Sequence, residues 1–204
     1  IMLVFKDIYK NFNVKQGSVE ALKNVSLKLD NGEFLVINGP SGCGKTTLLL
    51  VAGSLLHPTS GEVSIDGHDP YKMSHAERNQ LRANTIGFVF QQFHLIPYLS
   101  VRENIVSPAL AFVNNKETDR MEELAEHFGL ADRMDHYPHQ MSMGEKQRTA
   151  LARALFNKPR VILADEPTGN LDEDNAEIIF SYLKEYTRDG GSVLLVSHDR
   201  KAAQ

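Results

Sequence analysis

A glycine-rich segment between an apolar run and a helix constrains the fold of this chain more than any other feature. Gly39-Pro40-Ser41-Gly42-Cys43-Gly44-Lys45-Thr46 matches the pattern G-x-x-x-x-G-K-[S/T]. The preceding run 34–37 is apolar, as in a buried parallel strand, and a helix is expected from Lys45 to about Leu56. Glycines let backbone N–H groups wrap phosphate oxygens, and the helix N-terminus adds positive potential. We therefore interpret the segment as a phosphate-binding loop rather than a turn that binds nothing.

A second apolar run ends in two carboxylates. Residues 161–164 read Val-Ile-Leu-Ala and are followed by Asp165 and Glu166. In open α/β folds, ligands bind at the carboxyl ends of the strands. Beside a phosphate loop, Asp165 and the Thr46 hydroxyl are expected to hold Mg²⁺, Lys45 to reach the β- and γ-phosphates, and Glu166 to polarise the attacking water. Without the loop, a solvated strand end would be the simpler interpretation.

The order of the elements predicts a single α/β domain in these 204 residues. Strands alternating with helices favour a mainly parallel sheet. Strands are expected before and after a polar loop at 13–18, and Asn31-Gly32 is a hairpin-type turn. The region from Gln91 to about Tyr137 has only helical patterns, which indicates an inserted helical subdomain. The predicted divisions are a core with a β subdomain at 1–90 and 158–204, and a helical subdomain at 91–157.

Three patterns of the form S-x-x-E are capping boxes that predict helix starts at Ser74, Ser100 and Ser142. Met121, Leu124, Ala125 and Phe128 recur at helical spacing, and Gly129 is a plausible helix C-cap. Further helices are expected after Ser142 to about 157 and over about 174–188, and a last buried strand over 193–196.

Composition excludes several classes of protein. The net charge of −4 provides no basic footprint for nucleic acid. The longest nearly apolar stretch, 48–56, is far below the roughly 20 residues that span a bilayer. One cysteine, Cys43, excludes an intramolecular disulfide framework and fits a reducing compartment. The chain stops in a polar run after a predicted core strand, so we expect a short C-terminal segment beyond Gln204.

The segment Tyr137-Pro138-His139-Gln140-Met141-Ser142-Met143-Gly144-Glu145-Lys146-Gln147-Arg148 resembles the signature segment of ATP-binding-cassette (ABC) ATPases. The usual form is L-S-G-G-Q or L-S-G-G-E, then x-Q-R. The resemblance covers nearly the whole chain. Gln91 matches the family's Q-loop, Asp172 in Asn170-Leu171-Asp172 its D-loop, His198 its switch histidine, and Phe12 the aromatic that stacks on adenine.

The resemblance implies a P-loop fold of ABC type with ATP and Mg²⁺ as ligands and a head-to-tail homodimer. Ser142 and the Gly144 N–H would contact the γ-phosphate held by the partner, Asp172 would cross the interface, and His198 would fix the γ-phosphate and water. Gln91 would sense Mg²⁺ and the γ-phosphate and move the helical subdomain. The ATP-binding residues expected are Phe12, Gly39, Pro40, Ser41, Gly42, Cys43, Gly44, Lys45, Thr46 and Thr47.

The signature segment departs from the family at one important position. Met143 stands where the first signature glycine is usual, and it would either crowd the partner's nucleotide or point away while Gly144 makes the close approach. Glu145 in place of glutamine is a common family variant that also favours the helix start. Met141 in place of leucine conserves volume.

The resemblance is greatest to the branch of lipoprotein-release, macrolide-efflux and cell-division ATPases, through Phe88–Pro97 and Ala164–Asp172. It implies the ATPase subunit of a membrane transporter, peripheral on the cytoplasmic face of the inner membrane, with the permease contact sought at 92–103. The alternatives are a mechanotransmitting or cell-division ATPase that moves no solute, and a soluble nucleotide-binding module with weak turnover.

Two smaller features have simple interpretations. His136 and His139 are three residues apart, but no further ligands complete a metal site, so surface histidines are favoured. Cys43 is interpreted as a small residue tolerated in the loop rather than as a redox switch.

Overall fold

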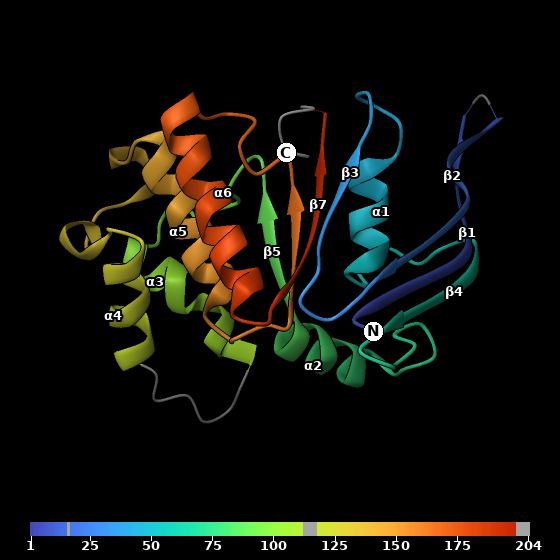
Figure 1. Ribbon diagram of the computed structural model, residues 1–204, viewed down its shortest axis with the longest axis horizontal. Helices are drawn as coiled ribbons and strands as arrows, with labels where there is room; N and C mark the ends of the chain where they lie inside the picture. Colours follow the sequence, from blue (N-terminus) through green and yellow to red (C-terminus); the bar gives the residue numbers. More distant parts are fainter. Residues whose placement is uncertain (16, 112–117, 199–204) are drawn as a thin grey trace.

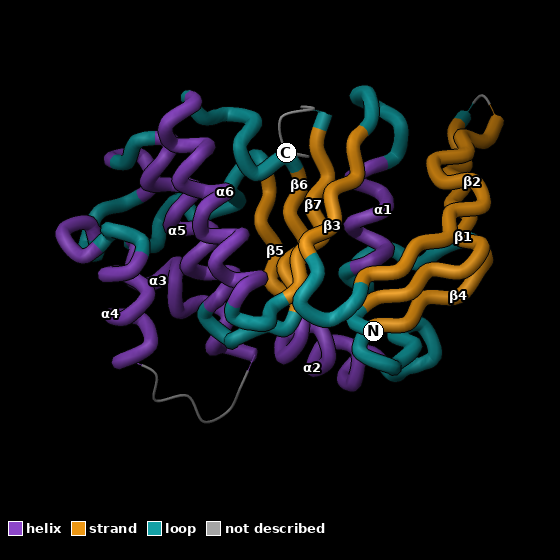
Figure 2. Tube along the Cα trace, in the orientation of Figure 1, coloured by secondary structure: helices purple, strands orange, loops and turns teal. Residues whose placement is uncertain are grey.

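The computed structural model describes residues 1–15, 17–111 and 118–198. Its centre is a parallel sheet in the order β3 (Phe34–Asn38), β7 (Ser192–Ser197), β6 (Val161–Asp165) and β5 (Ile86–Phe90). Its strands are short apolar runs, as expected where both faces of a sheet are covered. A second, antiparallel sheet lies beside it in the order β2 (Gly17–Leu29), β1 (Leu3–Val14) and β4 (Ser60–Ile65). Figure 2 shows the two sheets and the separate group of helices.

Strand β7 shows how the parallel sheet divides the core in two. Successive side chains of a strand point to opposite faces. Val193 and Leu195 therefore join one buried cluster, with the helices α3 to α6, while Leu194 and Val196 join the other. That second cluster contains α1 (Lys45–Ala52) and the antiparallel sheet. Helix α1 consequently lies between the two sheets (Figure 1).

The remaining helices lie mostly on the other side of the parallel sheet (Figure 1). Between β5 and β6 the chain forms α3 (Val101–Val106), η1 (Ser107–Ala111), α4 (Thr118–His127), η2 (Ala131–Arg133), η3 (Pro138–Gln140) and α5 (Met143–Leu155). Helix α2 (His75–Thr85) precedes β5, and α6 (Glu173–Arg188) connects β6 to β7. Among the residues that the structure describes, every regular element between β5 and β6 is therefore a helix.

Two local expectations about the strand connections are wrong. The region 13–18, expected to be a polar loop, mostly continues the β1–β2 ladder, with Asn13 opposite Ser18 and Val14 opposite Gly17. This ribbon is solvent-exposed, so its pairing depends on backbone hydrogen bonds rather than on apolar side chains. Asn31-Gly32 is a turn, but it joins strands of different sheets and closes no hairpin.

Helix α1 is shorter than predicted and ends at Ala52, not near Leu56. A Cβ at Gly53 would overlap the Phe88 ring of β5. The close approach of helix and strand thus requires glycine at that position. The three predicted capping boxes all form, at Ser74, Ser100 and Ser142.

Candidate active site

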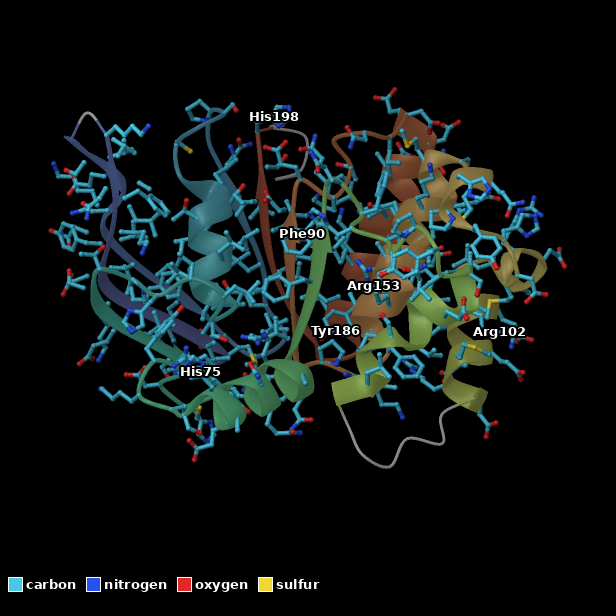
Figure 3. The ribbon with its side chains drawn as sticks, turned by 180° about the vertical axis from the view of Figure 1, so that it is seen from behind. His75, Phe90, Arg102, Arg153, Tyr186 and His198 are labelled. Atoms are coloured by element: carbon cyan, nitrogen blue, oxygen red, sulfur yellow. The ribbon has the colours of Figure 1, made fainter. Side chains whose placement is uncertain are left out.

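The carboxyl ends of the four parallel strands bring the predicted residues to one edge of the sheet. The glycine-rich loop follows β3, Gln91 follows β5, Glu166 follows β6 and His198 follows β7. In the rear view of Figure 3, His198 stands at the upper end of the sheet. Residues separated by more than a hundred positions in the sequence therefore share one surface, as expected for a parallel sheet.

The glycine-rich loop wraps the start of α1 and holds Lys45. Gly42 and Gly44 have φ of 80° and 97°, which a side chain would strain. The Lys45 side chain is buried, and its Nζ donates hydrogen bonds to Gly39 O at 2.8 Å and Pro40 O at 2.9 Å. The same Nζ lies 3.7 Å from Glu166 Oε1. The ammonium is thus held by two neutral carbonyls and one carboxylate, and a bound phosphate could replace the carbonyls with charged oxygens.

Glu166 lies between Lys45 and His198. Its φ is 45°, a left-handed conformation unusual for a side-chain-bearing residue, and its N–H donates to Val196 O at 2.9 Å. Glu166 Oε2 and His198 Nδ1 are 2.6 Å apart. Such backbone outliers cluster at active sites, where the surrounding structure maintains them. Here the backbone turns the carboxylate back toward the glycine-rich loop, as a general base for hydrolysis would require.

The pair Thr46 and Asp165 fits a magnesium site. The Thr46 hydroxyl donates a hydrogen bond to the Asp165 carboxylate, and burial raises the pKa of Asp165 despite that bond. A carboxylate whose charge is disfavoured by burial gains from a cation beside it. Hydroxyl and carboxylate oxygens are the ligand types that Mg²⁺ prefers. No cluster of three or more histidine, cysteine or carboxylate side chains suited to a metal occurs among the described residues.

Gln91 contacts the loop that follows Glu166. A Cβ at Gly169 would lie 2.7 Å from Gln91 Nε2, so the glutamine side chain packs directly against that glycine. Asn170 Nδ2 donates to Gln91 O at 2.9 Å. The Q-loop and the D-loop are therefore in contact within one chain.

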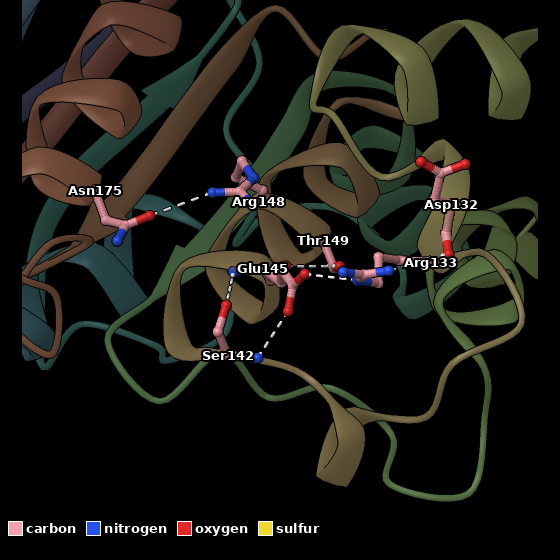
Figure 4. A network of polar contacts seen from close by, with 7 residues as sticks. All are labelled: Asp132, Arg133, Ser142, Glu145, Arg148, Thr149 and Asn175. Atoms are coloured by element: carbon pink, nitrogen blue, oxygen red, sulfur yellow. Dashed lines mark hydrogen bonds and ion pairs between the residues drawn. The ribbon is translucent and has the colours of Figure 1, made fainter.

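The signature segment forms the start of α5. Ser142 caps the helix, its Oγ accepting from Glu145 N and its N–H donating to Glu145 Oε2. Arg133 Nε donates to Glu145 Oε1 at 2.8 Å. These hydrogen bonds, the Ser142 N–H first and Arg133 next, lower the pKa of Glu145 to about 2. Figure 4 shows this network.

The two residues after Ser142 differ in exposure. Met143 is 52% exposed, whereas Gly144 is buried against α6. The preceding Met141 is also buried, at the place of the family's leucine. The methionine at the first signature glycine position thus points away from this chain's own core.

Phe12 lies on β1 opposite Val19 of β2 and is 37% exposed. The Phe12 ring therefore lies outside the buried core, where it is open to a stacking partner. Lys10 Nζ lies over its ring, 5.1 Å from the centroid, and donates to His57 O at 2.8 Å.

Comparisons with known proteins agree with this geometry. Residues 22–169 match the family model described as ABC transporter. The chain belongs to the ABC transporter family. It is 44% identical to the lipoprotein-releasing system ATP-binding protein LolD 1 of Rhodopirellula baltica, covering 99% of this chain and 90% of that protein. It is 41% identical to the putative hemin import ATP-binding protein HrtA of Staphylococcus haemolyticus, covering 98% and 91%.

A solved structure has the same fold. The dimeric post-hydrolysis state of the ATP-binding cassette MJ0796, bound to ADP and Pi, matches with a TM-score of 0.92 and 40% identity over 99% of this chain and 90% of that one. The protein is thus an ATP-binding, ATP-hydrolysing subunit of an ABC transporter. Among the residues that the structure describes, no helix has the length and apolar character needed to cross a bilayer.

Sequence reasoning missed several side-chain contacts that connect these motifs. Asn170 joins the D-loop to the Q-loop, and Asn175 joins the D-loop to the signature helix. Arg153 Nη1 and Nη2 donate to His94 O and Phe93 O, at 2.6 and 2.7 Å. Asn175 follows Asp172 by three residues, the spacing of a helix cap, and that signal could have identified it.

Proposed function

We propose that this ABC ATPase works as a head-to-tail pair of copies, in which each signature turn completes the other copy's nucleotide site. The observation that supports ATP hydrolysis at this site is the position of Glu166, whose two carboxylate oxygens face Lys45 and His198 beside the phosphate loop. Ser142 and Met143 are exposed at the start of α5, and the N–H groups of a helix N-terminus favour an anion. The dimeric structure of the MJ0796 cassette supports a working pair of copies.

ATP would be held by its phosphates and its base. Backbone N–H groups of the loop from Gly39 to Thr47 would bind the phosphate oxygens, and Lys45 Nζ would exchange the carbonyls of Gly39 and Pro40 for phosphate. Adenine would stack on the exposed ring of Phe12.

The residues proposed to hold Mg²⁺ are Thr46, Asp165 and Gln91. The ion would supply positive charge at the phosphate oxygens when bound. Asp165 fits this role because burial already disfavours its own isolated charge. Gln91 packs against Gly169, so a shift of its side chain would be transmitted to the D-loop.

Glu166 would accept the proton of the attacking water. His198 would fix the carboxylate and the γ-phosphate, so that the water oxygen bonds to phosphorus as the bond to the bridging oxygen breaks. The partner's Ser142 and Gly144 N–H would then stabilise charge on the transferred group.

Residues 91–157 would move as one helical unit, and 1–90 with 158–204 as the other. A groove of about 600 Å³ lies where the two meet, lined by α2, β5, η1 and α5. Figure 3 labels two of its residues, Phe90 and Arg153. Because Arg153 also binds the carbonyls of Phe93 and His94, the groove adjoins the expected contact segment 92–103. A cytoplasmic segment of the permease would dock here.

The permease itself is proposed to be of the lipoprotein-release or macrolide-efflux type, with this subunit peripheral on the cytoplasmic face of the inner membrane. The 44% identity to LolD 1 supports this choice. The chain is almost equally identical to HrtA, whose printed name gives a different cargo. We therefore propose that the permease, and not this chain, selects the cargo.

The decisive test is Glu166→Gln. We expect ATP binding to persist, hydrolysis to fall by about a hundredfold or more, and an ATP-Mg²⁺-dependent dimer to accumulate, because the proton acceptor is lost while the binding groups stay. Light scattering with size exclusion measures the dimer, and ADP is the matched control. A monomer at saturating ATP-Mg²⁺ would contradict the proposed pair.

The permease is tested by recovery of tagged Glu166→Gln, loaded with ATP-Mg²⁺, from detergent-solubilised native membranes. We expect a stoichiometric multi-spanning protein, identified by mass spectrometry. A cargo-transport assay with that permease then distinguishes a transporter from an ATPase that transmits force and moves no solute. Recovery of no membrane protein, with nucleotide binding intact, would favour a soluble module.

A further inference from the structure

Asn175, in the first turn of α6, bridges the D-loop and the signature helix. Its Nδ2 lies 2.9 Å from both carboxylate oxygens of Asp172, and its backbone N–H donates to Asp172 Oδ1 at 2.8 Å. Its Oδ1 accepts from Arg148 Nη1 of α5 at 3.3 Å (Figure 4). One amide side chain therefore uses its donor on one motif and its acceptor on another.

The same side chain occupies the space beside Gly144. A Cβ built on Gly144 would overlap Asn175 Oδ1 and Cγ, closer than real side chains approach, and would touch Arg148 Nη1 at 3.3 Å. Gly144 is buried, while its neighbours Ser142 and Met143 are exposed. The missing side chain at 144 thus makes room for this chain's own α6, rather than only for a nucleotide on the outer surface.

We propose that Asn175 is a positioning residue that holds the Asp172 carboxylate and the signature turn at a fixed separation, and that Gly144 is required because Asn175 packs against it. The proposal rests on the head-to-tail pair, in which both motifs face the partner copy. In that pair, a shift of Asp172 relative to Ser142 would misalign two contacts at once.

Asn175 makes the principal contacts of the Asp172 side chain. Asp172 is exposed, and Asn175 donates to both of its carboxylate oxygens through Nδ2 and to Oδ1 also through its backbone N–H. These bonds lower the pKa of the Asp172 carboxyl. Removal of the Asn175 side-chain amide takes away the Nδ2 bonds to both carboxylate oxygens of Asp172 while the backbone N–H cap stays, and it removes this acceptor from Arg148 Nη1.

The test uses the full chain with Glu166→Gln as the parent, and the dimer dissociation constant in ATP-Mg²⁺ as the readout. We expect Asn175→Ala to weaken the dimer about tenfold, since hydrogen bonds to charged groups are lost. Asn175→Asp keeps the shape and the Arg148 acceptor but sets a carboxylate against Asp172, so we expect similar weakening. Glu177→Ala, an exposed change further along α6, is the matched control and should leave the dimer unchanged.

Two further variants test the role of Gly144. Gly144→Ala should weaken the dimer strongly, and the double variant Gly144→Ala with Asn175→Ala should recover part of the loss, because the added methyl group then has room. ADP affinity of the monomer should stay unchanged throughout, since the glycine-rich loop is not altered. Thermal unfolding confirms that each variant is folded.

The outcomes separate the two proposals. If the Glu166→Gln parent stays monomeric in ATP-Mg²⁺, the head-to-tail pair is wrong. If the parent dimerises and both Asn175 variants dimerise equally well, the positioning role is wrong. If Gly144→Ala is not rescued by Asn175→Ala, the glycine serves the partner's nucleotide directly, which also overturns this assignment.

Discussion

At the residue scale, the Lys45 ammonium has hydrogen-bond and ion-pair partners that bound ATP would have to replace. It is buried, it donates to two loop carbonyls, and it lies 3.7 Å from Glu166 Oε1. A γ-phosphate would compete for the same ammonium, which would free the Glu166 carboxylate for water. When Lys45 exchanges Glu166 for the γ-phosphate, ATP binding would thus also make the Glu166 carboxylate available as a base.

The effect of Met143 on dimer affinity can be measured directly, by replacing it with the glycine that is usual in the family. Its side chain is 52% exposed at the first helical position of α5, so Met143→Gly should change the free energy of unfolding by no more than about 1 kcal/mol. On the Glu166→Gln parent we expect a dimer about three- to tenfold tighter, because the thioether no longer covers the helix N-terminus facing the partner's phosphate. Sedimentation equilibrium measures both forms.

Met143→Ala is the control for helix propensity, and it should show an intermediate tightening. If Met143→Gly dimerises no better than the parent, the methionine points away from the partner's nucleotide, and the Gly144 N–H makes the approach unaided.

At the element scale, helix starts were the most predictable features. A serine followed by glutamate three residues later satisfies backbone donors locally, so Ser74, Ser100 and Ser142 needed no tertiary information. Helix α1 has its C-cap at Gly53, and the packing of that glycine against Phe88 of a distant strand was not predictable. The bridge from Asn175 to Arg148 was equally hidden, since it joins two helices that only the fold brings together.

Glu145 should make the stability of α5 depend on pH. Its pKa falls from 4.5 to about 2 in the folded chain, so its contribution is complete above pH 4.5 and is lost as the pH falls toward 2. Glu145→Gln keeps the capping pattern without the charge and should cost about 1 kcal/mol at pH 7. That difference should shrink at pH 3, as measured by urea unfolding.

Glu77→Gln is the matched control, because Glu77 makes the same capping box in α2 but has no arginine on its carboxylate. Its effect at pH 7 should be smaller than that of Glu145→Gln. Equal effects would mean that Arg133 adds nothing to the signature turn.

At the scale of the whole molecule, the parallel sheet explains why the active-site cluster could be predicted and its connections could not. Short apolar strands indicated a parallel sheet. The carboxyl ends of its strands bring Lys45, Glu166 and His198 together, whatever the conformation of the connecting segments. How the helical region attaches to that edge depends on single side chains. Helix α5 carries the signature turn at its start and Arg153 near its end, so one rigid element reaches from the nucleotide surface to the groove.

Arg153 should therefore couple the two ends of α5 to the segment after the Q-loop. Its guanidinium is largely withdrawn from solvent, which lowers its pKa, and its two bonds to Phe93 O and His94 O hold a stretch where both residues have positive φ. Arg153→Lys keeps the charge but cannot reproduce the forked pair of donors. We expect faster hydrogen exchange over residues 93–100, unchanged ADP affinity, and loss of ATPase stimulation by the reconstituted permease.

Lys184→Arg, on the solvent side of α6, is the control for a basic substitution elsewhere. Unaltered exchange together with full permease stimulation would show that this helix does not transmit the closing motion through Arg153, and the link would then have to pass through the contact of Gln91 with Gly169 and Asn170.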